Sequence, residues 1–441
     1  MISSFRGHWG RSALAVTCLA GLMLSTACSA QPGAGGQAAI DEGTAFSVLT
    51  PNENTSIRAL LDSLAAGACK PANDALPLEN ETVAQADVVQ KMTLLASQGA
   101  LPHHFVAGTA QVRPDGDLGK AGLLVDYEAE LTTLGVADQV LPLAASTVKQ
   151  VYGQMVSLPY QYNVEGIWYN KKIFADNGVA EPKTWDDLVA TSETLKGKGI
   201  TPITEGGAQG WPLTRLMGMY IFRNAGADAM KKVRDGQAKL TDEAYVAGAA
   251  ALAELGAKGL LGEGVGSRET DAAQVQFLTG KAAMMYNGSW FLANTNDSEQ
   301  NKIGIENVGF MPVPAVTGGT GSIDQWAANA GAATSMNKTN FGPKSAAWLK
   351  CIVSNYGQTA LKEKGVISGF KVNGDVGDLP VTTKAVQEVV SNAKESVLWF
   401  EALFDAETNT LATKNVSLLV SGQMSPADYM AALQASLDAK K

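Results

Sequence analysis

The chain has 441 residues, of which 46% are hydrophobic and 17% are charged, and its formal net charge at pH 7 is −9. This length and composition suffice for two or three domains with sizeable hydrophobic cores. The negative charge argues against nucleic acid and anionic lipid as main partners, because both attract basic surfaces.

The first 28 residues have the layout of a signal peptide. Arg6 and Arg11 precede an apolar run at 12–24, which is typical of a secretory signal. The sequence LSTAC at 24–28 resembles a lipobox, in which a signal peptidase cuts before a cysteine that carries diacylglycerol. The resemblance implies a protein outside the cytoplasm, anchored to the cell membrane through lipid on Cys28. The alternative is an uncleaved membrane anchor, for which the apolar run is short.

Residues 29–43 begin with SAQPGAGGQAA, a composition that predicts a flexible tether. After the tether, 45–49 alternates as a strand does, and a helix is expected from about residue 55 to residue 66. Residues 74–82 are polar and irregular, whereas 83–97 and 142–152 show helical spacing.

His103 and His104 are the only histidines after residue 28. Adjacent residues on a strand point to opposite faces, and no nearby cysteine or H-x-x-x-H spacing accompanies the pair. We therefore expect no metal site and no cofactor.

The most informative stretch runs from 158 to 203. It predicts a buried strand at 166–169, a short helix at 172–177 that ends at Gly178, and a second helix with Thr184 as its N-cap. Asp187 lies three residues after Thr184 and completes a capping box. An inward stripe is expected at Trp185, Leu188, Ser192 and Leu195.

Further along, 205–211 is a glycine-rich loop that lacks the G-K-[ST] of a phosphate loop and leads to Trp211 and a helix. We expect strands at 282–286, 308–313 and 328–335, and helices at 344–355, 382–403 and 426–439.

Two motifs in this order resemble the maltose-binding-protein-like sugar-binding proteins of bacterial ABC importers. The first is a YNK-x-x-F turn followed by P-x-T-W-[DE]-[DE]-L and G-I-x-P-I, and the second is F-x-x-G-K-A-A-M-x-x-x-G-x-W. Their residues here are Tyr169, Asn170, Lys171, Phe174, Pro182, Thr184, Trp185, Asp186, Asp187, Leu188, Gly199, Ile200, Pro202, Ile203, Phe277, Gly280, Lys281, Ala282, Ala283, Met284, Gly288 and Trp290.

This resemblance implies an α/β fold of the two-lobe periplasmic-binding-protein type II kind, in which each lobe is a β-sheet flanked by helices. The N-terminal lobe would comprise 44–156 and 308–355, and the C-terminal lobe 157–307 and 356–441. Hinge strands at 156–159 and 308–313 would join the lobes.

Four cysteines are present. Cys18 lies in the signal and Cys28 carries the lipid, so Cys69 and Cys351 remain. An even number of remaining cysteines in a protein outside the cytoplasm favours a disulfide, and two separate buried thiols are the alternative.

Sugars present apolar C–H faces and a rim of hydroxyl groups, so their sites combine flat aromatic rings with carboxylates and amides. Four tryptophans lie beside glycine turns or at positions that face the cleft in the family, and polar residues occur at the first loop and the hinge. The residues expected to bind ligand are Glu53, Asn54, Tyr160, Gln161, Tyr162, Asn163, Trp211, Trp290, Trp326 and Trp399.

We expect a monomeric, non-catalytic protein that captures a carbohydrate, preferentially an oligosaccharide, and delivers it to ABC permease subunits. One alternative is a secreted glycosidase, although no motif marks a catalytic carboxylate pair, a G-x-S-x-G elbow or a Cys–His pair. Another is the same fold binding a polyamine or a metal, which the tryptophans and the scarcity of histidine disfavour.

Overall fold

The computed structural model describes residues 40–52, 55–84, 87–392 and 396–440, and Ile40–Lys441 forms one compact unit. The predicted signal with Cys28, most of the tether, and Glu53 and Asn54 lie outside the described residues. Within the described part, no helix combines the length and the apolar character needed to cross a bilayer.

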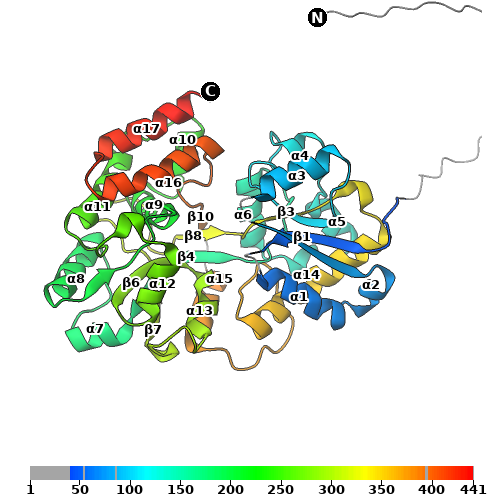
Figure 1. Cartoon of the computed structure of the whole chain (residues 1–441), viewed down its shortest axis with the longest axis horizontal. Helices are drawn as coiled ribbons and strands as arrows, with labels where there is room; N and C mark the ends of the chain where they lie inside the picture. The colour runs from blue at the N-terminus through cyan, green and yellow to red at the C-terminus, as the bar shows by residue number, and fades with distance from the viewer. Residues whose placement is uncertain (1–39, 53–54, 85–86, 393–395, 441) are drawn as a thin grey trace, which may run out of the picture. The chain divides into compact units, whose positions relative to one another are not determined.

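The strands of the described residues form two sheets (Figure 1). They are β1 (Phe46–Pro51), β2 (Leu78–Val83), β3 (His104–Ala107), β4 (Asn163–Asn170), β5 (Thr201–Ile203), β6 (Ala282–Gly288), β7 (Val308–Met311), β8 (Trp326–Asn329), β9 (Ala333–Met336) and β10 (Ser396–Val397).

The first sheet has the order β2-β1-β3-β9, in which β1 pairs in parallel with β2 and β3, and β9 runs antiparallel to β3. The second sheet is built around β4. Strand β6 pairs with one edge of β4, while β8 and β7 pair with the first and second halves of the other edge. Strands β5 and β10 extend this sheet in parallel with β6 and β8.

Helices cover both sheets. They are α1 (Thr55–Ala66), α2 (Lys70–Ala75), α3 (Val88–Ser97), α4 (Asp117–Lys120), α5 (Tyr127–Thr133), α6 (Pro142–Tyr152), α7 (Lys171–Asn177), α8 (Trp185–Gly197), α9 (Trp211–Ala225), α10 (Ala229–Arg234), α11 (Glu243–Ala257), α12 (Thr270–Leu278), α13 (Leu292–Asn296), α14 (Pro343–Lys364), α15 (Val381–Asn392), α16 (Ala406–Val420) and α17 (Pro426–Asp438).

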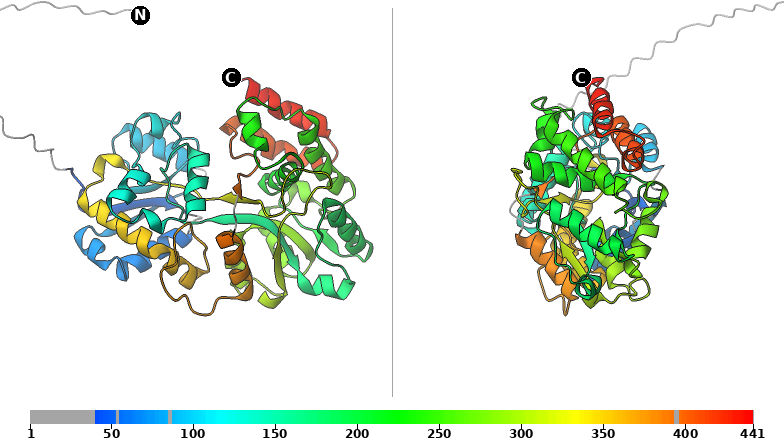
Figure 2. Two further views of the ribbon diagram at one scale, coloured as in Figure 1. Left: turned by 180° about the vertical axis from the view of Figure 1, so that it is seen from behind. Right: turned by 90° about the vertical axis from the view of Figure 1, so that its left-hand side faces the viewer.

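Each sheet has its own hydrophobic core, which defines two lobes. The N-terminal lobe packs α1, α5, α6 and α14 on the four-stranded sheet, and the C-terminal lobe packs α8, α9, α11, α16 and α17 on the six-stranded sheet. Strands β4 and β8 lie side by side between the two groups of helices (Figure 2). The expected two-lobe α/β architecture is therefore present.

The passage between the lobes differs from the expected hinge strands. Residues 308–311 form β7, which pairs with β4 in the C-terminal lobe, so 308 does not begin the N-terminal lobe. The predicted strand at 328–335 is instead two strands, β8 in the second sheet and β9 in the first, separated at Gly331. The chain thus changes sheets at 330–332, where small residues allow a sharp change of direction.

Two further expectations were wrong. Residues 78–83, of which 78–82 were expected to be irregular, form strand β2. Its sequence LENETV is polar because the strand lies at the edge of its sheet with alternating exposure, so composition alone does not indicate that it pairs with β1. The helix predicted at 382–403 ends by Asn392, and 396–404 instead contains β10 and a turn.

The helix predicted after Thr184 is confirmed in detail. The Thr184 hydroxyl accepts from the Asp187 N–H while the Asp187 carboxylate accepts from the Thr184 N–H. The four expected stripe residues of α8 are all buried. Helix α7 likewise ends at Gly178 in the left-handed conformation.

The N-terminal end of the described chain is fixed to the N-terminal lobe. The Glu42 carboxylate accepts from the backbone N–H groups of Lys344 and Ser345 at 3.2 and 2.7 Å, where a helix N-terminus favours negative charge. The tether therefore cannot extend to residue 43 as expected. A disulfide joins Cys69, which precedes α2, to Cys351 in α14, with Cα atoms 5.6 Å apart; this resolves the pairing that the sequence left open.

Candidate functional site

The start of α9 places a charged side chain between two aromatic rings. Trp211 and Arg215 are four residues apart and share one face of this helix. Gly210 precedes the helix with φ of 74°, and a Cβ there would lie 1.9 Å from the Thr413 carbonyl oxygen of α16. Only glycine fits this contact, so the first turn of α9 is held against α16.

Arg215 pairs with two buried carboxylates from distant parts of the chain. Its Nη1 lies 2.8 Å from Glu165 Oε1 of β4, and its Nε lies 3.1 Å from Glu401 Oε1. The side chains of Glu165 and Glu401 are 0% and 3% exposed, whereas Arg215 is 18% exposed. Arg215 is therefore the only member of this ion-pair triad whose side chain is appreciably exposed.

Polar groups on neighbouring strands complete the network. The Tyr286 hydroxyl donates to Glu165 Oε2 at 2.8 Å, and Asn329 Nδ2 donates to Glu165 Oε1 at 3.0 Å. Asn163 Nδ2 in turn donates to Asn329 Oδ1 at 3.3 Å, and Ser289 Oγ donates to Asn163 Oδ1 at 3.1 Å. These residues come from β4, β6 and β8 and the turn after β6.

Two indole rings lie beside Arg215 of the triad, and a third contacts one of these two. The Arg215 Cζ lies 5.0 Å from the ring centroid of Trp211 and 5.3 Å from that of Trp399. The Trp290 ring meets the Trp211 ring at 5.7 Å with an angle of 64°. Because a Cβ at residue 288 would lie 2.0 Å from Trp290 Cζ3, Gly288 allows this ring to lie over the backbone. All three indoles are partly exposed.

The charge states follow from burial and from the ion pairs. Burial raises the pKa of Glu401 above its usual range, although Arg215 acts to lower it, and Glu401 Oε2 has no hydrogen-bond partner. Burial lowers the pKa of Arg215, but attraction to Glu165 and Glu401 outweighs burial and raises it overall. The guanidinium therefore stays charged.

The site lies where the two lobes meet. Leu398 and Ala402 pack in the N-terminal core, whereas Phe400 and Phe404 pack in the C-terminal core. Arg113 Nη2 donates to the Ala402 carbonyl at 2.6 Å, and its Nε donates to the Val151 carbonyl of α6 at 3.0 Å. The segment that carries Trp399 and Glu401 is therefore fixed to both lobes.

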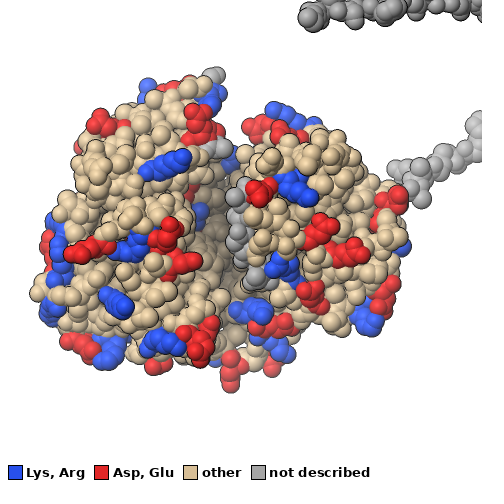
Figure 3. Space-filling model, viewed as in Figure 1, with Lys and Arg blue, Asp and Glu red and all other residues tan. Residues whose placement is uncertain are grey.

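Hollows separate the lobes at this junction. Figure 3 shows the surface recessed between the two halves of the molecule. A cavity of about 550 Å³ is lined by Lys149 of α6, Lys231 of α10 and Val397 of β10, among others. It adjoins Leu398 and Leu403, on either side of Trp399 and Glu401.

The structure brings together some of the ligand-binding residues expected from sequence. Trp211 and Trp399 lie beside Arg215, Trp290 contacts Trp211, and Asn163 joins the network through Asn329. Gln161 is partly exposed beside Gly331. Their contact with a ligand stays a prediction.

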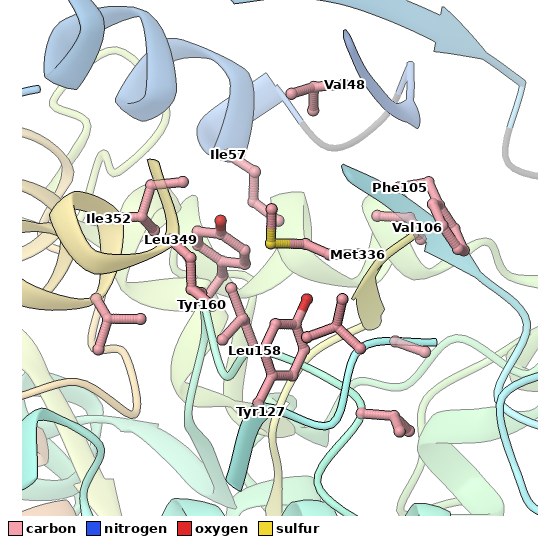
Figure 4. Packing of buried hydrophobic residues seen from close by; sticks show 14 of the residues in the cluster. Val48, Ile57, Phe105, Val106, Tyr127, Leu158, Tyr160, Met336, Leu349 and Ile352 are labelled. Carbon is pink, nitrogen blue, oxygen red and sulfur yellow. The ribbon is translucent and has the colours of Figure 1, made fainter. Parts of the chain in front are cut away.

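Other expected residues lie in the cores. Trp326 is 8% exposed and stacks on Phe310 at 5.5 Å. Tyr160 is 1% exposed and meets Tyr356 edge-on at 4.5 Å; Figure 4 shows it among Leu349, Ile352 and Met336. Tyr162 is also 1% exposed. Both tyrosines precede β4, which begins at Asn163, and they pack in different hydrophobic clusters.

Sequence reasoning missed six members of the network: Glu165, Arg215, Tyr286, Ser289, Asn329 and Glu401. The spacing of Arg215 four residues after Trp211 was an available signal, and so was an acid two residues after Trp399. Among the described residues, no group of three or more His, Cys, Asp or Glu side chains is placed to hold a metal ion.

This arrangement can bind a ligand that has both apolar faces and hydroxyl groups. Indole rings contact C–H faces with little loss of rotamer freedom, and carboxylates and amides accept and donate around the edge.

Solved structures with this architecture define the class. The fold matches a chitin oligosaccharide binding protein with a TM-score of 0.76 and 25% identity, over 90% of this chain and 99% of that chain. It also matches a protein from a study of xylan utilization by Caldanaerobius polysaccharolyticus, with a TM-score of 0.77, 19% identity and coverage of 89% and 100%. The molecule is a two-lobe solute-binding protein.

Sequence comparison gives the family. The family model described as bacterial extracellular solute-binding protein matches residues 77–358, which is more than half of the chain. The chain therefore belongs to this family.

Curated relatives match shorter stretches. A multiple sugar-binding protein of Streptococcus mutans is 30% identical over 148 residues, which are 32% of this chain and 35% of that protein. An ABC transporter extracellular-binding protein of Pyrococcus horikoshii, described as uncharacterized, is 28% identical over 204 residues, or 45% of each chain. These matches span less than half the length of the relatives.

Proposed function

We propose that the protein binds a carbohydrate, preferentially an oligosaccharide, in the cleft between its lobes and delivers it to the permease of an ABC importer. The observation that supports this most directly is the set of three partly exposed indoles around a buried carboxylate and amide network. A chitin oligosaccharide binding protein, a multiple sugar-binding protein and an ABC transporter extracellular-binding protein are among the similar proteins described above, which agrees with this proposal.

Ligand capture would involve closure of the two lobes by bending at the segments between the sheets, at 157–162 and 330–332. A ligand that contacts both lobes favours the closed state by its differential affinity for that state. We further propose that the protein acts as a monomer without a cofactor, held at the outer face of the cell membrane by lipid on Cys28. Radiolabelled palmitate incorporated in wild-type cells but not in a Cys28→Ala strain tests the anchor.

A non-catalytic role is proposed because neither buried glutamate of the network is free. A glycosidase needs one carboxyl group as acid and a second as base or nucleophile, whereas Glu165 and Glu401 are both paired with one arginine.

A thermal-shift screen against mono- and oligosaccharides tests the function. A ligand at 100 times its Kd should stabilise the protein by about 2.7 kcal/mol. Chromatography of the bound sugar after long incubation should recover it intact. No shift across chito-, xylo-, malto- and cello-oligosaccharides would contradict the proposal, and shortened products would favour the glycosidase.

A further inference from the structure

The charges at the site point to the kind of sugar that it accepts. We propose that the site selects against acidic sugars and takes neutral or amino-bearing ones, because Arg215 is already neutralised by Glu165 and Glu401. This inference rests on the proposed function and adds a charge rule to it.

The first observation is the excess of negative charge around the guanidinium. One arginine faces two glutamate side chains at 2.8 and 3.1 Å, so the ion-pair triad has one more acidic than basic side chain. The faces of the same guanidinium lie near the Trp211 and Trp399 rings. A carboxylate on a sugar would have to displace a glutamate from Arg215 or lie close to two like charges.

The second observation is a buried acceptor without a partner. Glu401 Oε2 is buried and has no hydrogen-bond partner among the described residues, and two donors beside the triad, the Tyr286 hydroxyl and Asn329 Nδ2, already donate to Glu165. A buried acceptor without a partner costs about 1–3 kcal/mol. A ligand that brings hydroxyl, amide N–H or ammonium donors suits this site, and one that brings another anionic acceptor does not.

A third observation concerns a buried carboxyl group that contacts the backbone of Tyr286, a member of the network. The Glu205 side chain is 1% exposed and accepts from the Tyr286 backbone N–H at 2.5 Å. Arg268 donates to the backbone carbonyl of Glu205 and to other carbonyls. Arg268, the cation beside Glu205, is therefore held by backbone carbonyls of the protein itself.

The test compares three forms of one sugar. The best neutral oligosaccharide from the thermal-shift screen is oxidised at one primary hydroxyl to the carboxylate, and part of that product is converted to the primary amide. The amide has nearly the shape of the carboxylate without its charge. Isothermal titration should give a Kd at least about tenfold weaker for the acid than for the amide, since like charges brought together cost several kcal/mol.

Two variants separate charge from shape. Glu401→Gln removes one negative charge with little change in volume and should reduce the gap between acid and amide severalfold. Glu299→Gln, at a side chain that is 91% exposed, is the matched control and should leave the gap unchanged. Circular dichroism and the melting temperature show whether each variant is folded. If Glu401→Gln does not fold, Glu165→Gln replaces it as the variant that removes one negative charge.

The outcomes distinguish the two proposals. Equal binding of acid and amide by the wild type, or a gap that Glu401→Gln leaves unchanged, overturns the charge rule while sugar binding stands. If no sugar in any form binds, the proposed function and the charge rule both fail.

Discussion

Removing the cation from the ion-pair triad should cost stability in a way that depends strongly on pH. The Arg215→Met substitution keeps an unbranched side chain between the Trp211 and Trp399 rings but leaves Glu165 and Glu401 buried without a counter-charge. Breaking a buried ion pair by removing one partner typically costs about 3–5 kcal/mol.

The structure allows this cost to be bounded. The variant can relieve the repulsion by protonating a glutamate, whose ordinary pKa is 4.5. Protonation then costs up to about 3.4 kcal/mol at pH 7 but only about 0.7 kcal/mol at pH 5. With about 0.5–1 kcal/mol for the lost cation–π contacts, we expect a loss of about 4 kcal/mol at pH 7 and about 1.5 kcal/mol at pH 5.

The direction in which this loss of stability changes with pH follows from the direction of the pKa shift. A carboxyl group whose pKa is raised in the folded state favours folding below its unfolded pKa, and this contribution is lost as the pH rises toward the folded pKa. Removing Arg215 should raise the pKa of Glu401 further. The deficit of the variant relative to the wild type should therefore grow between pH 5 and pH 8.

Urea unfolding at pH 5, 7 and 8 measures the deficit. The double variant Arg215→Met/Glu401→Gln should recover part of the loss at pH 7, with a coupling energy of about 1–3 kcal/mol. A deficit below about 1 kcal/mol at pH 7, or one that is the same at pH 5 and pH 8, would refute the view that Arg215 compensates two buried charges.

Three other predictions follow from the same structure. Trp290→Ala should weaken sugar binding by about 2 kcal/mol, or roughly thirtyfold, in isothermal titration. Trp326→Phe should instead lower the melting temperature and change Kd less than about twofold. The reverse pattern would show that Trp326 is the ligand-binding ring. Cys69→Ser should lower the free energy of unfolding by about 2–4 kcal/mol, and a reductant should lower that of the wild type equally; insensitivity of the wild type to reductant would argue against the bridge. Burial raises the pKa of Glu205 well above 4.5, so the free energy of unfolding of the wild type should fall as the pH rises from 5 to 8. This fall should be smaller in Glu205→Gln. An identical dependence of stability on pH in both proteins would mean that Glu205 is not buried as described.

Local signals in the sequence predicted much of the fold because they act over a few residues. The capping box of Thr184 and Asp187, the left-handed stop at Gly178 and the buried stripe of α8 depend on spacing within one helix. Strand β2 escaped prediction because its LENETV sequence is polar and its stability comes from pairing with β1. Pairing between segments that are distant in sequence cannot be predicted from a local sequence pattern.

The site was predictable only in part for a similar reason. Glycine turns and aromatic residues indicated Trp211, Trp290 and Trp399, but the side chain that groups Trp211 with Trp399 is Arg215. Its partners, Glu165 and Glu401, are 50 and 186 residues away in sequence. Trp326 also lies near glycines, yet it packs on Phe310, because proximity to a turn does not decide which face of the sheet a ring covers.

A fluorescence titration tests the central claim most directly, since three partly exposed indoles belong to the proposed site. Titration of the wild type with the best oligosaccharide from the screen should change the intensity or wavelength of tryptophan emission and saturate at the Kd measured by calorimetry. The double variant Trp211→Phe/Trp290→Phe, if folded, should lose most of this change and bind more weakly. An unchanged emission in the wild type despite calorimetric binding, or the full change in the double variant, would show that the sugar binds elsewhere.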